Sequence, residues 1–325
     1  MKIHLTSCET QPGAWRHQEQ ILRELWECSS RQHCLVGSPA EADIILIGNL
    51  RDENWFESLR RHPVISKYPN RCFALSETDE PKPLLRGIYT SAHRKLAFPF
   101  RCRTGAYTLQ HPDFNNPYIE NHRGGAFRSP KKHLFSFTGR NCHPVRTAIL
   151  NQPFERKDVF VRNTSDFDLF THENENKAVS QESFVQVMEA SKFVICPRGN
   201  GASSIRLFEA MKIGVAPILI SDDWILPKGP RWNEFALCIK ESEIGDLEAL
   251  AVRNEERWSE MGTLAAQEYE RHFSRTAYFD YVVTQCADML KSQPVPESVF
   301  WAMRDLFVFT WKAANRLRRV AGRFQ

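Results

Sequence analysis

Short apolar runs alternate with amphipathic segments along most of the chain. In the first half, residues 3–6, 42–47 and 72–75 have the length and apolar content of buried strands. Residues 15–26 and 54–61 lie between these runs and carry their apolar side chains at helical spacing. Alternating strands and helices are typical of parallel β-α units. The pattern therefore predicts an α/β first half.

The same pattern starts again after a long interruption. Residues 85–132 are rich in Arg, His, Pro and Gly, which suits loops and a connection between domains. Further strands are predicted at 133–137, 158–161, 192–196 and 215–220, and helices from about 144, at 181–190 and at 204–213. Residues 243–291 are nearly all helix-forming. We therefore predict three parts, at 1–130, 131–275 and, as a helical C-terminal tail, 276–325.

Composition narrows the class of protein. The 325 residues are 42% hydrophobic and 25% charged, enough for two cores without disulfides or metal. A net charge of only +4 argues against nucleic acid as a partner. Nine cysteines, with no C-x-x-C pair, suggest buried thiols in a reducing compartment. Because the start lacks the apolar stretch of a signal peptide, we expect a cytoplasmic location.

The segment after the predicted strand 192–196 carries the most chemistry. The loop and the helix start that follow this strand supply Arg198, Gly199, Gly201, Ser203 and Ser204. In open α/β sheets, ligands bind at the carboxyl ends of strands, and free amides at a helix start attract anions. The arginine offers a fork of donors to phosphate oxygens, and glycines let the backbone approach a ligand closely. The pattern predicts a phosphate-binding loop.

Two charged residues follow on the predicted helix. Arg206 and Glu209 lie three positions apart and share a face, where the carboxylate can accept both hydroxyls of a ribose. The alternative is an i,i+3 surface ion pair, which is common on helices. Cys196, at the end of the strand, is expected to be a buried thiol rather than a nucleophile, because no histidine stands beside it.

These residues belong to a longer motif. It reads C-P-R-G at 196–199, S-I-R-L-F-E-A at 204–210, and I-S-D at 220–222 before L-P at 226–227. In this order the motif resembles the exostosin-like glycosyltransferases, family 47. A weaker match, F-S-F-T-G-R at 135–140 with a following V-R at 145–146, extends the resemblance over about 133–240.

The resemblance implies the GT-B fold, an α/β arrangement of two Rossmann-like domains facing across a cleft. The nucleotide sugar then lies on the second domain and the acceptor mostly on the first, and transfer inverts the anomeric carbon. Carried over by position, the residues near the diphosphate are Arg198, Ser203, Ser204 and Arg206, with Glu209 at the ribose and Arg140 and Arg146 adding positive charge. The implied partners are a nucleotide-diphosphate sugar, UDP being the expected nucleotide, and a glycan or lipid-linked glycan acceptor, with no other cofactor.

Inverting transfer is a single displacement, so a base must take the proton of the acceptor hydroxyl. The acidic turn after the predicted strand 72–75 holds Glu77 and Asp79, and either is a candidate base because the carboxyl end of a strand faces the site in this fold. The alternative is that this run is a solvated turn. The chain offers three further candidates, His93, His111 and His122.

Other reaction classes find less support. Asp166 and Asp168 imitate a D-x-D metal site, but they lie in a polar loop where turn chemistry accounts for aspartate as well, so we predict no metal. The chain has no G-x-x-x-x-G-K-[ST] loop and no G-x-G-x-x-G after the first strand, which argues against P-loop NTPases and nicotinamide dehydrogenases. Two alternatives stay open: a GT-B transferase of another family, including a retaining one, and a non-catalytic module that binds nucleotide sugars.

Charge and aromatic residues gather at the C-terminus. Residues 291–325 hold seven basic side chains against two acidic ones, together with Phe300, Trp301, Phe307, Phe309 and Trp311. An aromatic, cationic helix is typical of monotopic attachment to a membrane surface. An anionic membrane surface, on the inner face, is therefore a candidate partner of residues 297–325. The alternative is that these aromatics pack back on the first domain.

Overall fold

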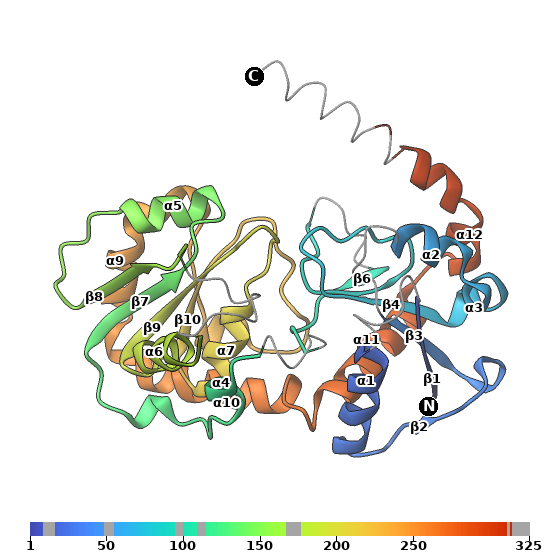
Figure 1. Ribbon diagram of the computed structural model, residues 1–325, viewed down its shortest axis with the longest axis horizontal. Helices are drawn as coiled ribbons and strands as arrows, with labels where there is room; N and C mark the ends of the chain where they lie inside the picture. The colour runs from blue at the N-terminus through green and yellow to red at the C-terminus, as the bar shows by residue number, and fades with distance from the viewer. Residues whose placement is uncertain are drawn as a thin grey trace.

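Two parallel β-sheets lie side by side, and helices cover each of them (Figure 1). The structure, a computed structural model, describes residues 1–8, 17–48, 55–94, 100–108, 115–166, 177–310 and 313. Within each sheet all neighbouring strands run parallel, and helices connect most of them. The chain therefore has the GT-B architecture of two Rossmann-like domains that the sequence led us to expect.

The first sheet has the strand order β2-β1-β3-β4-β5-β6. Its strands are β1 (Lys2–Ser7), β2 (Cys34–Leu35), β3 (Ile44–Gly48), β4 (Cys72–Ser76), β5 (Gly87–Tyr89) and β6 (Cys102–Arg103). Every residue of β3 and β4 is buried. Strands that are covered on both faces read as continuous apolar runs, which is why these two strands stand out in the sequence.

Helices from both ends of the chain cover this sheet. They are α1 (His17–Cys28), α2 (Trp55–Arg61), α3 (Pro63–Lys67), α11 (Tyr278–Ser292) and α12 (Glu297–Ala302). Alternate residues of β3 point to opposite faces, so that Ile44 and Leu46 pack with α1 and α11, whereas Ile45 and Ile47 pack with α2, α3 and α12.

The second sheet has the order β11-β10-β9-β7-β8. Its strands are β7 (His133–Gly139), β8 (Val159–Asn163), β9 (Ser191–Pro197), β10 (Ala216–Ile220) and β11 (Leu237–Cys238). The helices of this half are α4 (Pro117–Glu120), α5 (Pro144–Asn151), α6 (Lys177–Glu189), α7 (Ile205–Ile213), α8 (Trp232–Phe235), α9 (Leu247–Arg253) and α10 (Trp258–His272). Helices α6 and α7 pack on one face of the sheet, and α5 and α9 on the other.

Short 3-10 turns complete the connections. They are η1 (Pro39–Glu41), η2 (Pro69–Arg71), η4 (Ala126–Arg128), η5 (Glu241–Asp246) and η6 (Glu255–Arg257). In both sheets the strand order reverses between the first and the third strand of the domain, which are β1 and β3 in one and β7 and β9 in the other. Ligands of doubly wound sheets bind at the carboxyl end of this reversal. In the second domain that point is the edge formed by Gly139 and Pro197.

The C-terminal helices return to the first domain. Val283, Cys286 and Met289 of α11 are fully buried, and this helix packs against α1, β3 and β5. On α12, Glu297 and Trp301 are buried too. The sequence set residues 276–325 apart as a tail. In the described part, however, α11 and the inner side of α12 form layers of the first domain.

Most of the predicted strands and helices are present, with ends displaced by a few residues; Trp15 and Asn54, at the predicted starts of two helices, lie outside the described residues. Strands β5 and β6 were not predicted, because they are short and lie in the unpatterned stretch 85–132. The prediction of buried thiols is correct for five cysteines and wrong for Cys28, Cys34, Cys142 and Cys238, which are exposed. Two of these four lie on edge strands, one ends α1 and one lies in a loop.

Candidate functional site

The loop between β9 and α7 lies at the reversal point of the second sheet. Its start is fixed by the backbone amide of Arg198, which donates to the carbonyl of Ile220 at 3.0 Å. Its end is fixed by the Ser221 hydroxyl, which donates to the carbonyl of Ala202 at 2.7 Å. Residues at the end of β10 therefore hold residues 198–204 in one conformation.

Three arginines surround this loop. Arg146, from α5, donates to the carbonyl of Arg198 at 2.9 Å, so its guanidinium lies under the loop. Arg206, from α7, donates to the carbonyl of Thr138 at the end of β7. The side chain of Arg198 lies 3.7 Å from a carboxylate oxygen of Glu241. Positive charge is thus concentrated at the carboxyl ends of β7 and β9.

Several donors of this group lack a protein partner. Arg206 is 8% exposed, and its Nε and Nη1 atoms have no hydrogen-bond partner among the described residues. The same holds for the Nε atom of Arg198 and the hydroxyl of Ser204, which begins α7 without capping it. Burial, with the neighbouring charge of Arg146, lowers the pKa of Arg206 to about 10. Buried donors without partners are costly, and an anionic ligand at the helix start would satisfy them.

Glu209 follows Arg206 by one turn of α7. It is half-buried, and burial raises the pKa of its carboxyl to about 7, against the opposing charge of Arg206. Among the described residues the two side chains form no ion pair within 4 Å, because Arg206 turns to Thr138 instead. The alternative of an i,i+3 ion pair is therefore not realised in the structure.

The glycines of the loop face two different domains. A Cβ atom on Gly199 would lie 3.2 Å from the guanidinium of Arg146, in the second domain. A Cβ atom on Gly201 would lie 2.5 Å from the hydroxyl of Ser91 and 2.8 Å from a carboxylate oxygen of Asp79, both in the first domain. The loop is therefore packed between the two domains, and Asp79 lies directly against it.

Hydroxyl groups join the two domains at this point. Ser203 lies 2.6 Å from Ser91, oxygen to oxygen, and also bonds to the hydroxyl of Tyr107. Ser91 and Tyr107 are 3.1 Å apart. Burial raises the pKa of Tyr107, so the phenol remains protonated near neutral pH. The sequence did not single out Ser91 or Tyr107, because both lie in the unpatterned stretch 85–132.

A short backbone pairing continues this interface. The amide of Arg94 donates to the carbonyl of Asp223 at 2.8 Å, and the indole of Trp224 donates to the carbonyl of Thr90 at 2.8 Å. His93 pairs with Trp224 in an antiparallel bridge. Residues 90–94 of the first domain thus pair with the segment that follows β10, which places His93 at the interface.

The other candidate bases lie apart from the loop. Glu77 is 5% exposed and accepts a 2.6 Å hydrogen bond from the amide of Thr108, which places it inside the first domain. His122 lies 2.7 Å from Glu189 and accepts a bond from the amide of Gly124. His111 lies outside the described residues. Of the candidates within the described residues, the structure brings Asp79 against the loop.

The remaining residues named in the sequence analysis contribute less to this group of donors. The side chain of Arg140 is exposed, and its carbonyl accepts from Arg146 at 3.3 Å. Cys196 is buried, which raises the pKa of its thiol to about 12 and fits an unreactive thiol. Asp166 is exposed, and Asp168 lies outside the described residues. In the part of the chain that the structure describes, no group of three His, Cys, Asp or Glu residues could hold a metal ion.

Comparison with known proteins matches part of the chain, including this site, to a family. Residues 100–253 match the family described as the Exostosin GT47 domain. A "Probable glycosyltransferase" of Arabidopsis thaliana is 28% identical over 136 residues, which cover 41% of this chain and 26% of that protein. An "Exostosin-1 homolog" of Caenorhabditis elegans is 28% identical over 87 residues, 26% of this chain and 23% of that protein. Residues 100–253 therefore match the Exostosin GT47 domain, which confirms the resemblance seen in the sequence.

The chain spans about a quarter of the length of these relatives. Among solved structures, HepE of Anabaena in complex with UDP aligns with 90% of this chain and 100% of its own, at 11% identity and a TM-score of 0.38. MurG of Acinetobacter baumannii aligns with 88% and 99%, at 9% identity and a TM-score of 0.35.

Proposed function

We propose that this protein is an inverting glycosyltransferase that transfers a sugar from a nucleotide-diphosphate donor, with UDP as the nucleotide, to a glycan acceptor. One observation carries the proposal: buried guanidinium and hydroxyl donors without partners surround a fixed loop at the reversal point of the second sheet. Such a loop suits a diphosphate. The match of residues 100–253 to the GT47 domain adds the reaction class.

In this proposal the donor lies on the second domain. Arg198, Arg206 and the amides at the start of α7 bind the diphosphate, and Ser203 and Ser204 offer hydroxyls beside it. Arg146 lies under the loop and adds positive charge, and the exposed Arg140 adds more at the rim. Glu209, one turn further along α7, accepts the two ribose hydroxyls when it is ionised.

The reaction is a single displacement at the anomeric carbon. Asp79, which faces the loop from the first domain, takes the proton of the acceptor hydroxyl while the acceptor oxygen forms the new glycosidic bond. The bond from the anomeric carbon to the diphosphate oxygen breaks, and its electron pair leaves with the nucleotide. The guanidinium groups and the helix start stabilise the charge on the departing diphosphate. The proposal therefore assigns the electrostatic role to arginine rather than to a divalent cation.

The acceptor is proposed to be a glycan, a polysaccharide or a lipid-linked glycan that approaches from the first domain. The proposed location is the cytoplasm. The nine free cysteines support a reducing compartment.

Calorimetric titration with UDP, paired with a transfer assay, tests this function. Arg198→Ala and Glu209→Ala should each weaken UDP binding about tenfold or more, because a charge-assisted hydrogen bond is worth about 1.5–3 kcal/mol. Arg253→Ala, an exposed arginine on α9, is the matched control and should bind UDP as the parent does. Wild-type affinity in both site variants, for UDP and for any other nucleotide that the parent binds, would place the donor elsewhere.

The transfer assay separates the remaining alternatives. Product configuration read by NMR should be inverted at the anomeric carbon relative to the donor. A retained configuration would favour a retaining GT-B enzyme, and UDP binding without turnover across a broad set of acceptors would favour a binding module.

A further inference from the structure

Exposed apolar side chains concentrate in one short segment. Among the described residues, ten large apolar side chains are exposed, and six of them lie between residues 295 and 310. These six are Val295, Val299, Met303, Leu306, Phe307 and Phe309. Single exposed apolar residues are ordinary, but a contiguous group of them marks an interaction surface.

The helical segment 297–310 is apolar on two sides. Its inner side packs on the first domain, where Trp301 is 4% and Val308 is 5% exposed. On its outer side Met303 is 48%, Leu306 63% and Phe309 70% exposed. Each apolar side of a helix is stable when it packs against an apolar environment. The first domain supplies this environment on the inner side only.

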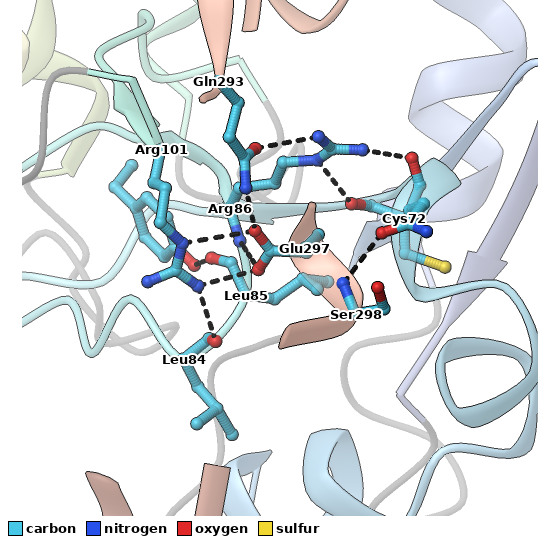
Figure 2. A network of polar contacts seen from close by, with 10 residues as sticks. Cys72, Leu84, Leu85, Arg86, Arg101, Gln293, Glu297 and Ser298 are labelled. Atoms are coloured by element: carbon cyan, nitrogen blue, oxygen red, sulfur yellow. Dashed lines mark hydrogen bonds and ion pairs between the residues drawn. The ribbon is translucent and has the colours of Figure 1, made fainter. Parts of the chain in front are cut away.

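A buried polar network fixes the start of this segment (Figure 2). Glu297 is fully buried, and one of its carboxylate oxygens lies 2.7 Å from the guanidinium of Arg101 and 3.1 Å from the backbone amide of Arg86. Gln293 donates to the other oxygen at 2.8 Å. Because one acidic side chain has three partners in the first domain and at the end of α11, the start of α12 is held in one orientation. Beyond α12, Asp305 pairs with Arg60 of α2 and holds the residues that follow.

Exposed basic residues lie on the helices beside this segment, and more follow it in the sequence. Asp305 pairs with Arg60 of α2, and α12 packs on η2, so this part of the helix lies beside α2 and α3. Arg61 and Lys67 on these helices are exposed. The sequence beyond residue 310 adds Lys312, Arg316, Arg318, Arg319 and Arg323 with no acidic residue; these five lie outside the described residues. An apolar helix face among basic residues is complementary to an anionic lipid bilayer.

We propose that the outer side of residues 295–310 binds to the surface of an anionic lipid bilayer. The segment lies on the bilayer and does not cross it: within the described residues no helix is both long enough and apolar enough to span a membrane. Leu306, Phe307 and Phe309 enter the boundary between headgroups and acyl chains, and the basic residues contact the lipid phosphates. This attachment is independent of the function proposed above.

Co-sedimentation of the full chain with lipid vesicles tests the proposal. Phosphatidylcholine vesicles are compared with and without phosphatidylglycerol, at low and at high salt. The variant Leu306→Ser/Phe309→Ser, called the patch variant, removes the two most exposed apolar side chains of the outer side. Val179→Ser/Val252→Ser is the matched control, because these side chains are 66% and 42% exposed and lie on α6 and α9. Truncation before Glu297 is unsuitable, since it would leave Arg101 charged and unpaired in the first domain.

The parent and the control should sediment with phosphatidylglycerol vesicles at low salt, and the patch variant should lose about tenfold or more in bound fraction. Circular dichroism and thermal unfolding of all three proteins establish that the folds are equal. Three results would overturn the proposal. They are no sedimentation of the parent, equal salt-sensitive binding of parent and patch variant, and a dimer in sedimentation velocity that the patch variant disrupts. The second would assign binding to charge alone, and the third would make this side a contact between two copies.

Discussion

The variant Gly201→Ala tests whether turnover depends on the close contact between the loop and Asp79. The added methyl group would lie 2.5 Å from the hydroxyl of Ser91 and 3.0 Å from the Cα atom of Asp79. An ordinary contact between such atoms is about 3.5 Å, so the loop must move about 1 Å from the Ser91 hydroxyl and about 0.5 Å from Asp79. A misplacement of about 1 Å can cost about 10²-fold in rate. We therefore expect turnover to fall, by up to about 10²-fold.

Donor affinity should change little in this variant, because the atoms nearest to the added methyl group belong to the first domain, whereas Arg206 and Glu209 lie on α7 of the second. The assay is turnover at saturating donor, combined with calorimetric titration of UDP. Gly245→Ala is the matched control, since a Cβ atom there meets nothing within 4 Å. If Gly201→Ala turned over as fast as Gly245→Ala, the contact between Asp79 and the loop would have no part in catalysis.

Four further predictions concern the candidate base, the ribose contact, the buried ion pair of Glu297 and the need for a metal ion. Asp79→Asn should lower turnover about 10²–10⁴-fold with donor affinity unchanged, and full turnover in this variant would rule out Asp79 as the base. Glu77→Gln should mainly lower the unfolding temperature, since the Glu77 carboxylate accepts a hydrogen bond from the backbone amide of Thr108. Affinity for a UDP sugar should weaken toward tenfold between pH 8 and pH 6, because the pKa of Glu209 is about 7 and only its ionised form accepts the ribose hydroxyls. An equal pH dependence in Glu209→Gln would contradict this. Glu297→Ala should lower the free energy of unfolding, measured in urea, by about 3–5 kcal/mol, because it leaves Arg101 buried and unpaired. A change near zero would show that the ion pair is dispensable for stability. Transfer should persist in EDTA; complete loss that Mn²⁺ restores would assign the leaving-group charge to a metal ion.

The sequence predicted the second domain better than the first, for a physical reason. Strands β7, β9 and β10 are continuous apolar runs between clear helices, and the loop residues predicted to bind phosphate follow β9 directly. Local patterns of this kind depend on neighbours in the sequence. The pairing of Ser91 and Tyr107 with Ser203 depends instead on residues about a hundred positions apart, and no local pattern encodes such a contact.

The acidic turn illustrates the same limit. Glu77 and Asp79 are two positions apart and alike in chemistry, so the sequence left both as candidate bases. In the structure one carboxylate turns inward to Thr108 and the other lies against Gly201. Side chains two apart at the end of a strand follow different paths once the chain leaves the sheet, and this difference is visible only in three dimensions.

The return of α11 to the first domain has a consequence for biosynthesis. The core of that domain joins β1 and β3 near the start of the chain to α11 at Tyr278–Ser292, whereas the strands and helices of the second domain come from one continuous stretch of chain. As the chain leaves the ribosome, the second domain can complete its core while the first still lacks a covering helix. We expect the second domain to acquire protease resistance first on the ribosome, so that the order of folding reverses the order of synthesis.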